Sequence, residues 1–207
     1  NGGRINTDFI DNSGGVDCSD HEVNIKILLS DAVKQGLLDW TERNQLLADM
    51  EEEVAQLVLR DNYQQTEAIS LDQSLNEQLL DEQVGFIRSL EKAGYMDRAT
   101  WHLPDDQEIA DRRANGEGLT RPELAVLLAY AKIDLYHAFL DSDVCEDPYL
   151  SQGVTHYFPV RIQDRFRAVA PRHRLRRELI ATFLANSMVN RMGLSFAHRI
   201  QELSDAS

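Results

Sequence analysis

Residues 120–140 read TRPELAVLLAYAKIDLYHAFL, and this stretch carries the strongest evidence for the fold class. Thr120 and Glu123 have the spacing of a capping box, in which a hydroxyl and a carboxylate bond the free amides of a first helical turn. Pro122 lies inside that turn, where proline is well tolerated. Residues 124–140 are apolar on most sides, as in a helix surrounded by other helices. We therefore predict a mainly helical, all-α domain with this helix at its core.

Apolar residues at helical spacing continue on both sides of this stretch. One amphipathic stripe runs from Thr41, the expected N-cap, to about residue 60, and a second runs over residues 75–90 and ends at Gly94. Two such helices pack naturally as an antiparallel hairpin. Asp105 and Asp106 would open a shorter helix, where the helix dipole favours negative charge. Further helices are predicted at residues 105–114, 172–192 and 194–203.

The first 20 residues differ in kind, because they are rich in Gly, Asn, Asp and Ser. A short run from Ile5 to Ile10 could form a strand. Residues 19–22, Ser-Asp-His-Glu, match a second capping box and predict a helix that begins near Asp20 and ends at Gly36. We therefore expect a strand, loop and helix segment over residues 1–36, followed by a helical domain over residues 37–207.

Composition limits the classes of function. The chain has 207 residues, of which 43% are hydrophobic and 27% are charged, as in globular proteins. Its net charge of −14 disfavours binding to nucleic acid or anionic lipid. No stretch approaches a membrane span, and the polar N-terminus lacks a signal-peptide core. Cys18 and Cys145 show no CxxC spacing, which suits a reducing compartment. We expect a soluble, cytoplasmic protein without nucleic-acid or membrane partners.

Seven arginines lie between residues 161 and 177 and allow two interpretations. A nucleic-acid patch has this density, but the acidic background and the lack of interleaved aromatics favour ion pairs with carboxylates such as those of residues 51–53 and 141–147. The six histidines are dispersed without HExxH spacing, so we expect no metal site. Trp40, Trp101 and Phe183 are interpreted as core or interface aromatics.

Residues 12–19, NSGGVDCS, form the segment whose residue types indicate a candidate ligand-binding site. Adjacent glycines let a backbone approach a ligand closely, while Asn and Ser offer neutral hydrogen bonds. A helix N-terminus just beyond would favour an anion, so the segment could cradle a carboxylate or phosphate. On the residues alone, however, a tight turn into a helix is the better interpretation.

A family resemblance changes that balance. Residues 12–16 followed by Ser19 resemble the Asn-Ala-Gly-Gly-Val-x-x-Ser motif of glutamate dehydrogenases. Residues 2–13, GGRINTDFIDNS, resemble the large bacterial NAD-dependent class in particular, and residues 118–132, GLTRPELAVLLAYAK, resemble another segment of that class. The resemblance implies that residues 1–36 are the end of a catalytic region and that residues 37–207 are a C-terminal helical domain.

The resemblance also implies roles for individual residues. Asn12 matches the family asparagine beside the nicotinamide, and Gly14 and Gly15 accompany it as cofactor-facing positions. Val16 matches an apolar position of the substrate pocket, and Ser19 matches the serine that hydrogen-bonds the side-chain carboxylate of glutamate. Ser13 departs from the usual alanine, and the Ser19 hydroxyl has a competing role as the expected helix cap.

The implied activity is that of an intact enzyme, which would convert L-glutamate, water and NAD into 2-oxoglutarate, ammonium and NADH. Such chemistry needs a lysine of lowered pKa and a dinucleotide fold. The lysines all fall on predicted helices, and no GxGxxG motif is present. We therefore predict that this chain holds no catalytic residue and does not bind NAD alone. Its expected partners are the remaining catalytic domain of the same protein and further copies of the protein in a homo-oligomer.

The alternative is a non-catalytic helical module for interaction, regulation or oligomerisation, with residues 12–19 acting only as a turn. The fate of the first long helix discriminates the two hypotheses. If that helix packs into the core of the helical domain, the non-catalytic hypothesis is favoured.

Overall fold

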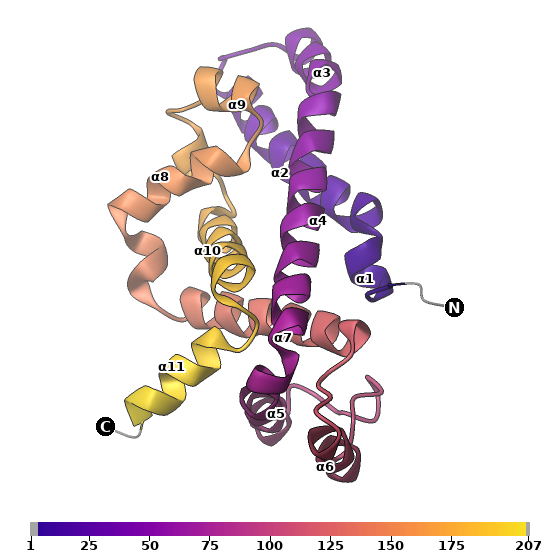
Figure 1. The fold of residues 1–207 in the computed structure, drawn as a ribbon. Helices are drawn as coiled ribbons and strands as arrows, with labels where there is room; N and C mark the ends of the chain where they lie inside the picture. Colours follow the sequence, from indigo (N-terminus) through magenta and orange to yellow (C-terminus); the bar gives the residue numbers. More distant parts are fainter. Residues whose placement is uncertain (1–3, 206–207) are drawn as a thin grey trace. The chain divides into compact units, whose positions relative to one another are not determined.

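The computed structural model describes residues 4–205, and within them the chain is all-α, with eleven α-helices, two short 3-10 helices and no strand (Figure 1). The described residues form two compact units. The first unit comprises residues 64–135, residues 185 onward and the N-terminal residues up to 11; the second comprises residues 12–63 and 136–184. None of the described helices is both long and apolar enough to cross a bilayer. The predicted fold class is confirmed.

The first unit is built around α7 (Arg121–Leu140). Leu124, Leu127 and Leu128 are fully buried, which confirms that this helix is central to a core. The amide of Thr120 donates to the Glu123 carboxylate at 2.6 Å, so the helix begins where its sequence predicts. The other helices that contribute to this unit are α1 (Asp8–Asp11), the end of α4 (Glu51–Ser74), α5 (Asn76–Lys92), α6 (Asp106–Ala114), the end of α10 (Arg176–Met192) and α11 (Phe196–Asp205).

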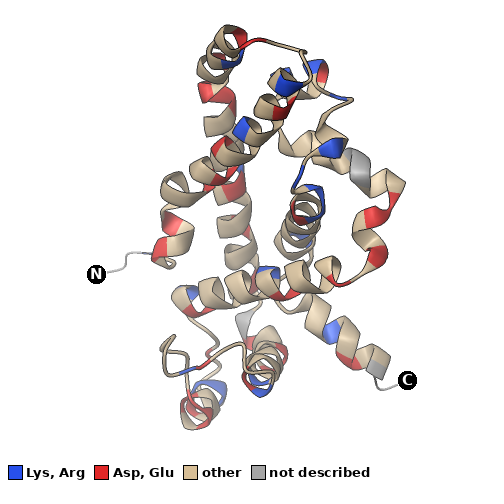
Figure 2. Cartoon of the chain, turned by 180° about the vertical axis from the view of Figure 1, so that it is seen from behind, with Lys and Arg blue, Asp and Glu red and all other residues tan. Residues whose placement is uncertain are grey.

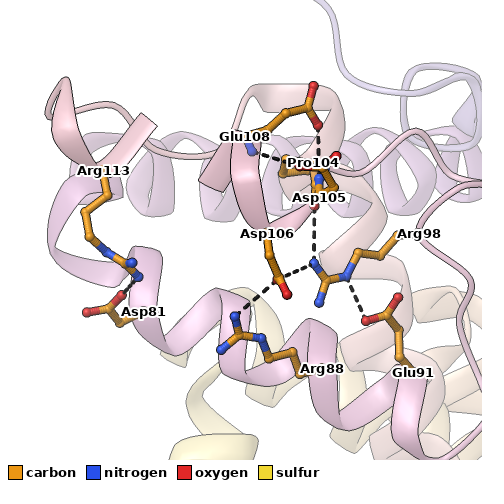
Figure 3. A network of polar contacts seen from close by, with 9 residues as sticks. All are labelled: Asp81, Arg88, Glu91, Arg98, Pro104, Asp105, Asp106, Glu108 and Arg113. Atoms are coloured by element: carbon orange, nitrogen blue, oxygen red, sulfur yellow. Dashed lines mark hydrogen bonds and ion pairs between the residues drawn. The ribbon is translucent and has the colours of Figure 1, made fainter. Parts of the chain in front are cut away.

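A polar network fixes the connection between α5 and α6 (Figure 3). Asp105 is the N-cap of α6 and forms a complete capping box with Glu108, which confirms the structural interpretation of the acidic pair at this helix start. Arg98, whose side chain is only 14% exposed, donates to Glu91 at 2.7 Å and to Asp106 at 3.0 Å. The bond from Arg98 is the main reason why the pKa of Asp106 is lowered.

The second unit has its own core, and α2 (Ser13–Lys34) is part of it. Ile25, Leu28 and Leu29 belong to the same buried cluster as Phe158 and Ile180. Residues on both sides of the expected boundary at 36/37 therefore lie in one unit, and the first long helix packs into a helical core. The other helices are α3 (Trp40–Asp49), the start of α4, η1 (Asp143–Glu146), α8 (Pro148–Tyr157), α9 (Val160–Arg165), η2 (Ala170–Arg172) and the first part of α10.

The strand predicted at Ile5–Ile10 is wrong, because α1 occupies Asp8–Asp11. A strand needs a neighbour to satisfy its backbone groups, and the structure shows none in the residues it describes. The amides of Ile10 and Asp11 instead bond the carbonyl of Thr7 at 3.0 and 2.9 Å, and the Ile10 side chain joins the core of the first unit. Burial of one apolar residue thus decides the local structure.

Three other helix starts and the extent of one predicted helix also differ from the sequence predictions. The first long helix begins at Ser13 rather than near Asp20. Asp39, not Thr41, caps α3, and it forms a capping box with Glu42. The stripe predicted to run on to residue 60 is interrupted at Met50, which is 1% exposed and separates α3 from α4. The last pair begins with α10 at Arg176, after a 3-10 turn that contains Pro171.

The aromatic residues expected in a core or interface are partly exposed. Trp40 is 58% exposed, while Trp101 and Phe183 are each 39% exposed. Trp101 donates its indole N–H to the Tyr130 hydroxyl at 2.8 Å. These side chains are therefore not core anchors, and their place in an interface stays a prediction.

The arginine-rich stretch is paired with carboxylates, as the ion-pair interpretation predicts. Arg161 donates to Glu53 at 2.7 Å, and Arg174 donates to Asp31 at 2.9 Å and thereby lowers the pKa of that carboxyl group. Basic residues lie among acidic ones along the ribbon (Figure 2). The arginines of this stretch with carboxylate partners are Arg161, Arg165, Arg174, Arg176 and Arg177.

One buried carboxylate in the first unit makes stability depend on pH. Asp72 is 5% exposed and accepts from the Leu194 amide at 3.4 Å; burial is the main reason why its pKa is raised. A raised folded-state pKa means that the ionised group destabilises the fold at neutral pH, and that this penalty disappears as the pH falls through the folded pKa. We expect Asp72→Asn, which keeps an acceptor, to be more stable than the parent at pH 7 in urea unfolding. The difference should shrink toward pH 4, and a difference independent of pH would contradict this cause.

Candidate functional site

The predicted site residues lie on the exposed side of α2. Asn12, Val16, Ser19 and Val23 follow one another at intervals of four, three and four residues, which places them on one face of a helix. Val16 is 71% exposed and Val23 is 53% exposed, and Asn12 and Ser19 are exposed as well. We call these four residues the outer stripe of α2. The opposite face holds the buried residues, so α2 joins a core on one side and presents the outer stripe on the other.

The first turn of α2 lacks a side-chain cap. Asn12 is the N-cap residue, yet its side chain makes no capping hydrogen bond within the described structure. Its amide group lies over Gly15, where an added Cβ would come within 2.8 Å of Nδ2. Gly15 is therefore required for this placement of Asn12, whereas Gly14 has open space around it. The first amides of a helix have no partner within the helix and can receive an anion.

Ser19 is not a helix cap, which corrects the sequence prediction. The hydroxyl lies within α2 and donates to the Gly15 carbonyl at 3.5 Å, the long limit of a hydrogen bond. The helix starts earlier, at Ser13, whose hydroxyl accepts a hydrogen bond from the Asn62 amide on α4, a residue distant in sequence. The competition between capping and ligand binding at Ser19 is thereby removed.

A partly buried polar network holds α2 in place. The side-chain amide of Asn24, a residue 4% exposed, donates to the Tyr157 hydroxyl at 3.0 Å, and that hydroxyl donates to Asp20 at 2.6 Å. Burial, and then the bond to Asp20, raises the pKa of Tyr157. The network was not predicted; its only signal in the sequence is a polar Asn24 in the apolar stripe of a helix.

His173 adds a second tie to the same helix. Its Nδ1 accepts from the Leu175 amide at 3.1 Å, so Nε2 carries the proton and donates to the Asn24 carbonyl at 3.0 Å. Burial lowers the pKa of His173, which favours the neutral ring that this arrangement requires.

On the side of α2 away from the outer stripe, α2 and α4 bring together a histidine and two carboxylates. His21 Nε2 lies 4.0 Å from Asp17 Oδ1 and 3.8 Å from Asp61 Oδ2. Sequence reasoning missed this group because Asp61 is on another helix, forty residues from His21, and no second histidine marks the place.

The chemistry available on the outer stripe of α2 is binding rather than proton transfer. The lysines of this helix, Lys26 and Lys34, form ion pairs with Glu22 and Asp31 and are exposed or half-exposed. The outer stripe offers a hydroxyl, a carboxamide and two apolar side chains. Such groups can bind and orient a ligand.

Comparison with known proteins identifies the family. Residues 1–72 match the family model "Bacterial NAD-glutamate dehydrogenase, catalytic domain", and residues 116–207 match "Glutamate dehydrogenase, C-terminal". NAD-specific glutamate dehydrogenases of Halomonas elongata and Pseudomonas aeruginosa are each 47% identical to the chain over 99% and 100% of its residues, and the Mycobacterium tuberculosis protein is 42% identical over 97%. The chain spans only 12–13% of the length of these relatives. By both comparisons, the chain belongs to the bacterial NAD-glutamate dehydrogenase family.

Proposed function

We propose that this chain forms one edge of the catalytic pocket in a full-length enzyme that oxidatively deaminates L-glutamate. The full-length protein would convert L-glutamate, water and NAD into 2-oxoglutarate, ammonium and NADH. Residues 1–36 would belong to the catalytic region and residues 37–207 to the C-terminal helical domain, although the catalytic-domain family model extends to residue 72. The chain alone would neither bind NAD nor turn over glutamate.

The observation that carries this proposal is the exposure of the outer stripe of α2. Val16 is an aliphatic residue left 71% exposed on a helix whose other face is buried. An exposed apolar position beside an exposed hydroxyl and carboxamide suits a pocket wall whose opposite wall lies elsewhere in the protein. Residues 1–72 also match the catalytic-domain model of the family.

The roles follow the positions along the stripe. Ser19 would donate its hydroxyl hydrogen to the side-chain carboxylate of glutamate, and Val16 would contact the aliphatic part of the substrate. Asn12, Gly14 and Gly15 would lie toward the nicotinamide of NAD, with Gly15 allowing the Asn12 amide its position. The rest of the catalytic domain would supply the lysine, the proton-transfer carboxylate and the dinucleotide fold.

The test is steady-state kinetics of the full-length enzyme with Ser19→Ala and Asn12→Ala. A hydrogen bond to a charged group contributes about 1.5–3 kcal/mol, so Ser19→Ala should lower kcat/KM for glutamate by roughly 10- to 100-fold. The KM for NAD should change little in that variant. Asn12→Ala should instead raise the KM for NAD.

Matched controls are available on helices away from the stripe. Ser74→Ala removes an exposed hydroxyl that donates to the Leu71 carbonyl, and Asn44→Ala removes an exposed carboxamide. Both controls should keep parental kinetics, and circular dichroism should show equal helical content in all variants. Parental kinetics in Ser19→Ala and Asn12→Ala would contradict the proposed pocket.

The second candidate function is a non-catalytic helical module. The packing of α2 into the core of the second unit favours it, because that core holds the helix without help from other parts of a larger protein. In this case residues 12–19 would only start a helix, and both stripe variants would keep parental activity. We further propose that the full-length protein is cytoplasmic and forms a homo-oligomer. Light scattering of the full-length protein would test the oligomeric state.

A further inference from the structure

We propose that Asp17, His21 and Asp61 bind one divalent transition-metal cation, such as Zn²⁺, that joins α2 to α4 within the second unit. The inference is independent of the proposed catalytic role, since these residues lie on the side of α2 that faces α4.

The positions of the three ligand atoms suit one small cation. They all lie within 4.8 Å of one another, and His21 Nε2 is 4.0 Å from Asp17 Oδ1 and 3.8 Å from Asp61 Oδ2. Zinc bonds to nitrogen and oxygen of about 2.0–2.2 Å place tetrahedral ligand atoms about 3.4 Å apart. Small side-chain rotations therefore close the site. The present separations exceed hydrogen-bond distance, so closure breaks no hydrogen bond between these atoms.

His21 is a buried polar side chain that points into this group. The residue is 3% exposed, and its Nδ1 is buried without a hydrogen-bond partner in the described part of the chain. Its ring stacks on Tyr157 with a centroid separation of 4.7 Å, which fixes the direction of Nε2. A buried polar side chain without hydrogen bonds destabilises a protein. Nε2 is the ring nitrogen that faces the two carboxylates, so coordination there would give the buried ring a polar partner, while Nδ1 would stay without one.

The donor set selects the class of cation. An imidazole nitrogen with two carboxylates suits Zn²⁺, Co²⁺ or Mn²⁺, whereas Ca²⁺ and Mg²⁺ prefer oxygen ligands alone. Asp17 and His21 are four residues apart on one helix, the spacing that puts two ligands on one face. The side chains of Asp17 and Asp61 are 27% and 26% exposed, which leaves a route for the ion and a position for water.

A simple ion pair is the competing explanation, in which a protonated His21 lies between two carboxylates. Among the described residues, Asp61 shows an ion-pair contact with His21 and with no lysine or arginine. The ion pair needs no metal and predicts no stoichiometric binding.

The experiment is a titration of the 207-residue chain, freed of metal with a chelator and then dialysed. We expect calorimetry with Zn²⁺ to show one binding site, Co²⁺ to develop visible absorption bands, and Zn²⁺ to raise the melting temperature. His21→Gln and Asp61→Asn should each weaken Zn²⁺ binding by at least about 10-fold, since even residues that only support metal ligands contribute about 10- to 100-fold. Both replacements are close in size to the original side chains, and circular dichroism checks their folding.

The matched control is His198→Gln. His198 also has a carboxylate four residues away, Glu202 at 3.5 Å, and its side chain is only 10% exposed, but it shows one carboxylate partner rather than two. This variant should keep parental Zn²⁺ affinity. Absence of a one-to-one site in the parent chain would overturn the proposal, as would an affinity unchanged by both His21→Gln and Asp61→Asn. The Co²⁺ spectrum of the parent chain tests the proposal even if a variant fails to fold.

Discussion

Replacing Phe158 with alanine is expected to lower the free energy of unfolding by about 3–5 kcal/mol, the usual loss for a large aromatic removed from a core. Phe158 is 0% exposed in the second unit, and its ring lies 5.1 Å from Tyr157 and 5.7 Å from His173 between centroids. The substitution removes contacts with both rings and leaves a cavity that rigid neighbours fill only in part. Urea unfolding followed by circular dichroism would measure the loss.

The control for Phe158 is Tyr149→Ala on the neighbouring α8. Tyr149 is 80% exposed, so its truncation should change stability by no more than about 0.5 kcal/mol. Equal losses in the two variants would show that the ring of Phe158 is not a core element. Because the chain has two compact units, unfolding should also be followed by hydrogen exchange, and the amides of α2 should lose protection in Phe158→Ala.

Replacing Arg112 with methionine is expected to destabilise the first unit by about 2–3 kcal/mol. Arg112 holds Glu123 with two hydrogen bonds of 2.6 and 2.9 Å, and Glu123 is only 8% exposed. Removing one partner of a fully buried pair costs about 3–5 kcal/mol because the other charge stays buried, and the partial exposure of Arg112 reduces that figure. Thermal or urea unfolding of the chain would measure the loss.

The adjacent Arg113 is a matched control for Arg112. It pairs with Asp81 on α5, apart from the contacts of Arg98 (Figure 3), and the two side chains are 54% and 80% exposed. Arg113→Met should cost less than about 1 kcal/mol, since exposed pairs are solvated and screened. A similar loss in both variants would mean that burial does not set the strength of the Arg112 pair.

The site was readable from the sequence only in part. A family motif marks the glycine pair and Ser19, and the structure places Ser19 with Asn12 and Val16 on the exposed outer stripe of α2. The residues around α2 could not be predicted from the sequence, because Asn62, Asp61 and Tyr157 contact α2 from parts of the chain that are distant in sequence. Contacts of that kind leave no local pattern.

The sequence by itself determined the all-α class, the central place of α7 and several helix ends. These features rest on signals that act within a few residues. Capping pairs such as Asp105 with Glu108 satisfy the free amides of a first turn, and Gly36, Gly94 and Gly193 adopt positive φ of 72°, 76° and 98° where helices stop. Local chemistry decides them whatever the rest of the chain does.

Only the tertiary structure decided where α2 begins, that α1 is not a strand, and that His21 meets two carboxylates. Each outcome depends on a distant partner or on burial: Asn62 for the first turn of α2, the core for Ile10, and α4 for His21. The free energy of burying a side chain or completing a hydrogen bond exceeds the small local preferences of a Gly-rich or β-branched segment. These positions are therefore set by packing between elements and not by the residues next to them.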